Sequence, residues 1–259
     1  MSDLFAPFVA DPGSAGLFLD FDGTLSDIVH VPDEARPLEG VTDLLTLLSA
    51  RLNVVAIVSG RSAGQLLEWL GPEVEIWGVH GVQRAIDGQV TTSSRASEFV
   101  PLMNNVREEA AILVEALGMD GVVLEDKGVM VGLHFRAAED VKAAEAALRA
   151  VADDLVERYG LTRAGGRLAF ELRPPMEISK SLVVLERARE AHLRSVAFVG
   201  DDRVDLPGFD ALDQLHDEGM HTVRVAVDSS EAPAELLERA DIVVDGPRGL
   251  LPLLRRLID

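Results

Sequence analysis

The sequence predicts an α/β fold in which a doubly wound parallel sheet carries an inserted α+β domain. Towards both ends of the chain, short apolar runs that end in polar or glycine residues alternate with amphipathic stretches, a pattern typical of parallel strands joined by helices. In the middle, the pattern changes to one helix followed by two adjacent strands, repeated twice. Apolar residues make up 47% and charged residues 26% of the 259 positions, the composition of a folded globular protein.

The strands of the parallel sheet are predicted from apolar runs that leave neither face polar. These runs are residues 16–20, 53–58, 195–200, 222–227 and 242–244. Continuous apolar strands are buried on both faces, so helices must cover the sheet above and below. The amphipathic stretches that would supply those helices are residues 40–52, 180–192, 205–216 and 232–239.

The middle of the chain predicts a smaller antiparallel layer. Asp87-Gly88, between residues 83 and 92, is a hairpin signal. Helices are expected at 99–117 and 139–159, and strands at 122–124, 129–135, 161–163 and 168–172, the last two joined at Gly165-Gly166. Tight turns between consecutive strands favour antiparallel pairing. We expect a core domain of residues 1–88 and 176–259, with an α+β cap domain of residues 89–175 inserted into it.

Charge and composition exclude several classes of partner. Lys and Arg total 24 against 44 Asp and Glu, for a net charge of −20, so nucleic acid and anionic membranes, which require a basic surface, are poor partners. The absence of cysteine excludes disulfides, thiolate nucleophiles and Cys-ligated metals. No basic residue precedes Arg36 and no apolar run is long enough to span a membrane. We expect a cytoplasmic monomer with a small-molecule substrate.

Two carboxylates follow the first predicted strand, in Asp20-Phe21-Asp22-Gly23-Thr24. The carboxyl edge of a parallel sheet is where ligands bind, and alternation along an extended chain directs Asp20 and Asp22 to one side. Such a pair suits a metal and a phosphate, with one carboxylate as nucleophile and the other as proton donor and acceptor. A calcium loop would need Gly at its sixth position and Glu at its twelfth, but Gly23 is fourth and Val31 twelfth.

Ser59-Gly60-Arg61 follows the second predicted strand, and Ser62 is placed to start a helix. A hydroxyl group and free amides at this edge can hold phosphate oxygens, and Arg61 offers a planar fork to a substrate. Taken alone, Ser-Gly after a strand is ordinary turn chemistry.

Further charged residues are expected at the same edge. Lys180 lies where the chain re-enters the parallel domain and can screen charge between a carboxylate and a phosphate. Gly200-Asp201-Asp202 and Asp205 follow another apolar strand, and their carboxylates repel one another unless a divalent cation binds. Oxygen ligands without cysteine favour magnesium.

The order of these four motifs along one chain resembles the haloacid dehalogenase superfamily of aspartate-dependent phosphatases, whose fold is a doubly wound core with an added cap. The resemblance implies that Asp20 is the nucleophile, Asp22 the acid and base, and Ser59 and Lys180 phosphate-binding groups in catalysis. It implies a Mg²⁺ site formed by Asp20, the Asp22 main-chain carbonyl and Asp201, supported by Asp202 and Asp205. Gly60 and Arg61 would bind the substrate.

The insert resembles that of trehalose-6-phosphate phosphatases. The matching segments are Gly78-Val79-His80-Gly81, Glu125-Asp126-Lys127-Gly128, Leu133-His134-Phe135-Arg136 and Glu171-Leu172-Arg173-Pro174-Pro175. In that family the residues that match Glu125, Lys127 and Glu171 face the sugar, and the resemblance implies that His80 and Arg136 also bind the substrate. For His80 and His134 the alternative is a packed, hydrogen-bonded side chain.

Three positions depart from the family pattern. Ser181 follows Lys180 where Gly is usual, Leu206-Pro207 stands where acidic residues are frequent, and Phe135 replaces a frequent Tyr. The resemblance implies Mg-dependent hydrolysis of trehalose 6-phosphate through an aspartyl-phosphate. Two alternatives stay open: a phosphatase for another sugar phosphate, of the sucrose phosphate or mannosylglycerate phosphate type, and a catalytically silent sugar-phosphate-binding regulatory subunit.

Overall fold

The computed structural model describes residues 3–29, 34–166, 168–229 and 232–258 and divides them into two compact units. The first unit combines the two ends of the chain, up to Thr91 and from Ile178 onward. The second unit comprises Thr92–Glu177 and also takes in Val29 and Glu34. The cap domain limits of 89 and 175 stay a prediction.

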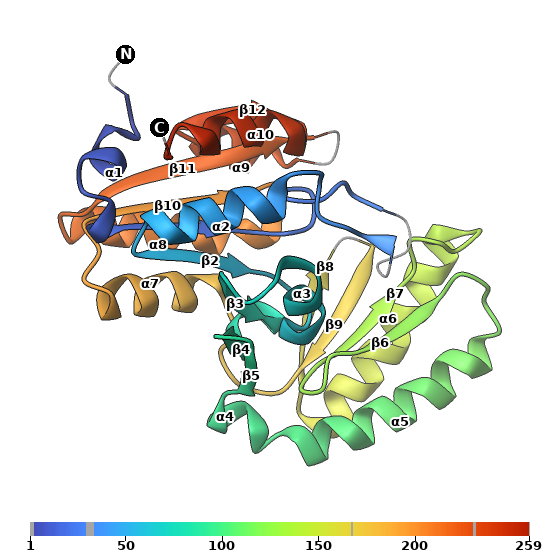
Figure 1. Cartoon of the computed structure of the whole chain (residues 1–259). Coiled ribbons are helices and arrows are strands. Elements are labelled where there is room, and N and C mark those ends of the chain that lie inside the picture. Colours follow the sequence, from blue (N-terminus) through green and yellow to red (C-terminus); the bar gives the residue numbers. More distant parts are fainter. Residues whose placement is uncertain (1–2, 30–33, 167, 230–231, 259) are drawn as a thin grey trace. The chain divides into compact units, whose positions relative to one another are not determined.

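Among the described residues, the first unit is built on an eight-stranded sheet with the order β12-β11-β10-β1-β2-β3-β4-β5. Its strands are β1 (Ala15–Leu19), β2 (Val54–Val58), β3 (Glu75–Gly78), β4 (Gln83–Ile86), β5 (Gln89–Thr92), β10 (Ser195–Gly200), β11 (His221–Asp228) and β12 (Ile242–Asp245). Neighbours from β12 to β3 pair in parallel, and β4 is antiparallel to β3. Strands from the two ends of the chain, blue and orange in Figure 1, lie side by side. The predicted fold class is confirmed.

Helices cover both faces of this sheet. They are α1 (Ala6–Ala10), α2 (Val41–Arg51), α3 (Ala63–Leu70), α7 (Lys180–Glu190), α8 (Leu206–Asp217), α9 (Ala234–Arg239) and α10 (Gly246–Arg255), with short 3₁₀ turns at Pro12–Ser14, Val79–Gly81 and Arg203–Asp205. On β1, Phe18 packs into the apolar cluster formed with α7, α8 and α9, while its neighbours Leu17 and Leu19 are fully buried on the opposite face. No helix among the described residues has the length and apolar character to cross a lipid bilayer.

The second unit is a four-stranded antiparallel sheet, as far as its residues are described, with the order β6-β7-β9-β8. Its elements are α4 (Ser94–Ser97), α5 (Val100–Leu117), β6 (Val123–Asp126), β7 (Val131–His134), α6 (Val141–Tyr159), β8 (Thr162–Gly166) and β9 (Ala169–Arg173). Helices α5 and α6 pack on one face, where Met103 and Leu148 meet Leu133 and Phe170. The predicted repeat of one helix and two strands is confirmed.

The structure corrects or extends the sequence-based expectation in several places. The turn predicted at Gly165-Gly166 is wrong, because both residues belong to β8 and pair with Phe170 and Ala169; glycine accepts an extended backbone as readily as a turn. The hairpin at Asp87-Gly88 is confirmed, with φ angles of 50° and 74°, but both of its strands extend the large sheet. The sequence does not predict strand β3, because its buried and partly exposed residues alternate and it contains no long apolar run.

Gly78 at the end of β3 allows the chain to pass directly against the start of α3. A Cβ atom at this position would lie 2.3 Å from the Ala63 amide nitrogen and 2.8 Å from the Arg61 carbonyl oxygen. Both neighbours are backbone atoms, which cannot turn aside as a side chain can. The close approach therefore fixes the loop that follows β2.

Replacing Gly78 by Ala should lower the free energy of unfolding by about 1–3 kcal/mol, the usual range for overpacking. Gly64 in α3 is the matched control, because a Cβ there has open space and Gly64→Ala should add roughly 0.5–1 kcal/mol by restricting the unfolded chain. Urea denaturation measures both changes. An unchanged free energy of unfolding in Gly78→Ala would show that the loop shifts to accommodate the added methyl group.

Candidate active site

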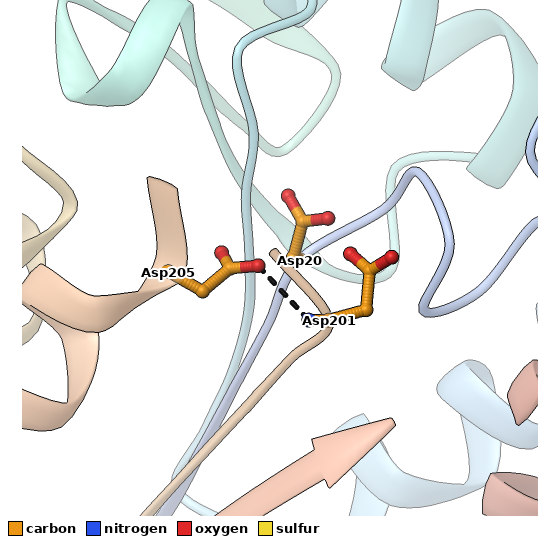
Figure 2. A group of neighbouring side chains, drawn as sticks. All are labelled: Asp20, Asp201 and Asp205. Atoms are coloured by element: carbon orange, nitrogen blue, oxygen red, sulfur yellow. Dashed lines mark hydrogen bonds between the residues drawn. The ribbon is translucent and has the colours of Figure 1, made fainter. Parts of the chain in front are cut away.

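Three buried aspartates meet at the carboxyl edge of the large sheet. Asp20 follows β1 and Asp201 follows β10, two neighbouring strands in which Leu19 pairs with Val199. Asp205 ends the 3₁₀ turn that precedes α8. Each residue offers a carboxylate oxygen, and these oxygens lie within 4.8 Å of one another (Figure 2). The parallel register thus gathers carboxylates that are far apart in the sequence.

Lys180 binds two of these carboxylates. It is the first residue of α7 and only 1% exposed, and its Nζ donates hydrogen bonds to Asp20 Oδ1 at 2.5 Å and Asp205 Oδ1 at 2.7 Å. The preceding residue, Ser179, caps the helix by accepting a hydrogen bond from the amide of Ser181. Ser181, a departure from the family pattern, is therefore compatible with the helix start that places Lys180.

Burial and neighbouring charges shift the pKa values of both Asp20 and Lys180. Burial raises the pKa of Asp20 to about 7, Lys180 opposes the rise, and the nearby carboxylates of Asp205 and Asp22 add to it. Burial alone would lower the pKa of Lys180, but the carboxylates of Asp20 and Asp205 hold this pKa above its ordinary value. The lysine therefore stays charged, and ionising Asp20 is costly.

The cluster fits a divalent metal ion. Lys180 pairs with two of the three buried carboxylates, those of Asp20 and Asp205, so the ionised cluster of these four residues carries excess negative charge. Carboxylate oxygens are hard ligands, which suit a hard divalent cation better than zinc or copper. A bound cation would neutralise the excess charge.

Asp205 also holds the loop that carries Asp201. Its Oδ2 accepts hydrogen bonds from the amides of Asp201 and Asp202, both at 3.0 Å, while its Oδ1 binds Lys180. Asp205 also packs directly against Gly200, since a Cβ atom at Gly200 would lie 2.4 Å from Asp205 Cγ. Asp205 thus connects the lysine to the loop after β10.

Of the four aspartate carboxylates in the predicted metal site, the structure gathers those of Asp20, Asp201 and Asp205. The side chain of Asp22, predicted as the acid and base, receives two hydrogen bonds from Arg61, both at 2.7 Å. Asp202 Oδ1 accepts a hydrogen bond from the amide of Arg203 at 2.6 Å. The backbone explains the separation of Asp22: the amides of Leu25 and Ser26 bind the carbonyl of Phe21, so the chain turns immediately after the strand.

Ser59 lies at the end of β2 in a loop held by backbone hydrogen bonds. Its Oγ accepts from the amide of Arg61 at 3.2 Å and its carbonyl accepts from His80 at 2.8 Å, while the Arg61 carbonyl accepts from Val79 at 2.8 Å. Val79 and His80 have φ angles of 52° and 54°, in the left-handed region that a β-branched residue such as Val79 rarely adopts. The predicted loop containing Gly60 is therefore tied to the buried His80.

The cap residues singled out in the sequence form a second charged cluster. Lys127 Nζ donates to Glu171 at 2.8 Å and lies 3.5 Å from Glu125. His134 donates to Glu125 at 2.7 Å, which confirms that it is hydrogen-bonded, and Arg173 donates to Glu171 at 2.5 Å. Burial alone would lower the pKa of Lys127, but Glu171 and Glu125 raise it.

This cluster lies on the sheet face that the helices leave uncovered. Glu125, Gly132 and Glu171 form one row across β6, β7 and β9, and they alternate with residues such as Leu133 that face α5 and α6. The sequence predicts no role for Arg173, although this residue lies two positions after Glu171 and therefore on the same strand face. Arg136 is half-buried just beyond β7.

The sequence model of the trehalose-phosphatase family matches residues 18–240. The chain belongs to the trehalose-phosphatase family. Curated relatives named trehalose-phosphate phosphatase include one from Mycobacterium avium, 34% identical over 244 residues, and one from Mycobacterium leprae, 32% identical over 256 residues. These alignments cover 86% and 93% of this chain but only 61% and 57% of the relatives, so the chain spans about three fifths of their length.

Solved structures of similar fold support the assignment of this trehalose-phosphatase chain to the haloacid dehalogenase fold. A trehalose-6-phosphate phosphatase related protein matches with a TM-score of 0.78 at 23% identity, covering 94% of this chain and 96% of that one. The C-terminal domain of a Candida albicans trehalose-6-phosphate phosphatase gives 0.80 at 22% identity, covering 98% and 95%. A haloacid dehalogenase-like hydrolase from Bacteroides thetaiotaomicron gives 0.63 at 15%, covering 94% and 99%.

The raised pKa of Asp20 predicts that the site lowers stability in metal-free protein. The folded state holds this proton more tightly than the unfolded chain, so its contribution to stability is present below about pH 4 and is lost as the pH rises through about 7. Asp20→Asn should therefore raise the Tm at pH 8 by about 3 °C or more, the shift that roughly 1 kcal/mol gives a chain of this size.

Thermal denaturation in chelator at pH 5 and pH 8 measures this effect, and the gain should shrink at pH 5. Exposed Asp120 provides a control, because Asp120→Asn should leave the Tm unchanged at both pH values. An Asp20→Asn variant less stable than the wild type at pH 8 would contradict the prediction.

Proposed function

We propose that this chain is a magnesium-dependent trehalose-6-phosphate phosphatase, which hydrolyses trehalose 6-phosphate to trehalose and phosphate in trehalose biosynthesis. The observation that carries the proposal is the buried cluster of Asp20, Asp201, Asp205 and Lys180 at the carboxyl edge of the sheet. It combines a nucleophile with groups that hold a cation, in a chain whose family acts on a sugar phosphate.

The first step transfers the phosphoryl group to Asp20. A carboxylate oxygen of Asp20 attacks phosphorus, the bond between phosphorus and the sugar oxygen breaks, and Asp22 gives a proton to the departing oxygen. In the second step water attacks the aspartyl-phosphate, one of its protons passes to Asp22, and the bond between phosphorus and Asp20 breaks to release phosphate. One turnover therefore returns Asp20 as a carboxylate and Asp22 as a protonated carboxyl group.

The remaining groups bind and screen the phosphoryl group. The Ser59 hydroxyl and the amides around Gly60 would hold phosphate oxygens, and the charged Lys180 would reduce repulsion between Asp20 and the phosphate. Asp20, Asp201 and the Asp22 carbonyl would hold Mg²⁺, with Asp202 and Asp205 supporting them. When bound, this ion supplies the positive charge that lets a dianionic phosphate approach ionised carboxylates.

The charged cluster of the cap supports a disaccharide as the leaving group. Lys127 contacts both Glu125 and Glu171, and these two glutamates belong to one sheet face. Carboxylates and ammonium groups bind sugar hydroxyls well. His80 and Arg136 complete the proposed substrate-binding residues.

The strong negative charge of the chain supports small-molecule partners over nucleic acid, and we propose a cytoplasmic monomer.

Phosphate release from a panel of sugar phosphates, with and without Mg²⁺, tests the proposal. Trehalose 6-phosphate should be hydrolysed fastest, and chelator should abolish turnover until Mg²⁺ is restored. Faster hydrolysis of sucrose phosphate or a mannosylglycerate phosphate would identify the alternative phosphatase, and binding without hydrolysis would identify the regulatory subunit. Asp20→Asn is the negative control for contaminating phosphatase, because it lacks the nucleophile.

Replacing Glu125, Lys127 or Glu171 by Ala should separate sugar recognition from phosphoryl transfer. Hydrolysis of trehalose 6-phosphate should fall about 10²-fold, because remote binding energy is expressed in the rate, while p-nitrophenyl phosphate, which has no sugar, should be hydrolysed at the wild-type rate. Steady-state kinetics on both esters measures the contrast. Equal losses would mean that these residues only stabilise the cap.

A further inference from the structure

Arg61 binds the Asp22 carboxylate through two parallel hydrogen bonds. Its Nε donates to Asp22 Oδ2 and its second terminal nitrogen donates to Oδ1, each at 2.7 Å. The Arg61 side chain is 9% exposed and that of Asp22 is 38% exposed. A two-point contact of this kind fixes the plane of a carboxylate as well as its position.

The Arg61 guanidinium is itself held on several sides. Its remaining terminal nitrogen donates to Gln65 Oε1 at 3.2 Å, and its carbon lies 5.0 Å from the centre of the Trp69 ring and 5.7 Å from that of Phe21. Gln65 and Trp69 belong to α3, whose start is fixed by the Ser62 cap. A helix, an aromatic pair and a close-packed loop therefore determine where the guanidinium points.

Sequence reasoning assigned Arg61 to the substrate, but its contacts suggest a different task. Each of its three guanidinium nitrogens already donates to a side chain of the protein. Asp22 lies just beyond the end of β1 and precedes Gly23, whose φ of 82° marks a turn, and the two hydrogen bonds from Arg61 restrain its carboxylate there. A carboxylate that must deliver a proton to one oxygen and remove one from water gains rate from a fixed orientation.

We propose that Arg61 is a positioning residue that orients Asp22 for both proton transfers, an inference that rests on the proposed function of Asp22 as acid and base. A Lys at this position keeps the charge but cannot form the planar two-point contact. The rate contributed by Arg61 should therefore depend on how much the leaving group needs a proton.

The test compares phosphoryl transfer from a poor and a good leaving group in a single turnover. Arg61→Gln and Arg61→Lys should each slow transfer from trehalose 6-phosphate by about 30-fold or more, a part of the 10²–10⁴-fold that acid catalysis supplies. The burst of nitrophenol from p-nitrophenyl phosphate should stay within about threefold of wild type, because nitrophenolate leaves without a proton. Weaker binding and slower transfer of both esters alike would show that Arg61 binds the phosphoryl group, and would overturn the proposal.

A matched control separates positioning from loss of an ion pair. Arg187 makes a similar two-point contact with Glu75 in the same unit, at 2.6–3.0 Å, away from the cluster at the carboxyl edge. Arg187→Gln should leave the transfer rates of both esters unchanged, although it removes an ion pair of the same kind. A loss specific to the sugar phosphate in this variant would overturn the assignment.

A double-mutant comparison isolates action through Asp22. Adding Arg61→Gln to Asp22→Asn should cause no further loss with trehalose 6-phosphate, since the group that Arg61 positions is already gone; a further 30-fold loss overturns the proposal. If the wild type hydrolyses another sugar phosphate of the panel instead, only the proposed substrate fails, and the comparison is made with that ester. A wild type that hydrolyses no phosphate ester overturns both proposals.

Discussion

The site depends on one buried ammonium group held between two carboxylates. Lys180 is almost inaccessible to solvent and donates to both Asp20 and Asp205. Removing the lysine from such an arrangement leaves two uncompensated carboxylates inside the protein. The end of β1, the start of α7 and the loop after β10 must therefore meet with the geometry that satisfies this lysine, and the central strands of the sheet are arranged around that requirement.

The same arrangement explains why the cluster is reactive. Within the cluster, three carboxylates outnumber one ammonium, and burial, with a smaller contribution from the neighbouring carboxylates, raises the pKa of Asp20. A bound cation would supply the missing positive charge, and the site could then accept a dianionic phosphate. Functional sites of this kind reduce stability in the absence of ligand.

The fold and the central residues could be predicted from the sequence because both follow local rules. Apolar runs such as residues 195–200 allow only buried strands, and the carboxyl ends of parallel strands share an edge, so Asp20, Asp201 and Lys180 were expected together. What could not be predicted depends on side-chain direction. The pairing of Asp22 with Arg61 requires knowing where the chain turns after Phe21.

Two strands could not be predicted correctly because their sequences carry only a weak apolar pattern. Strand β3, with its alternating burial, has no strong apolar signal, and two glycines in β8 resemble a turn. In the cap, the sequence segments identified Glu125, Lys127 and Glu171 through resemblance alone. Their mutual contacts, and the contact of Arg173 with Glu171, follow from the cross-strand register, which a single sequence does not specify.

The pairing of β1 with β10 has a consequence for how the chain folds. Ala15 pairs with Ser195, so the central strand of the large sheet has one neighbour that is synthesised only after the whole second unit. The pairings of the second unit connect residues that are much closer in the chain, such as Glu125 with Gly132, and contacts of short sequence separation close at a lower entropic cost. On the ribosome, the cap can therefore assemble while the apolar strand β1 still lacks β10, and the chain must keep that strand from aggregating until the last quarter of the sequence emerges.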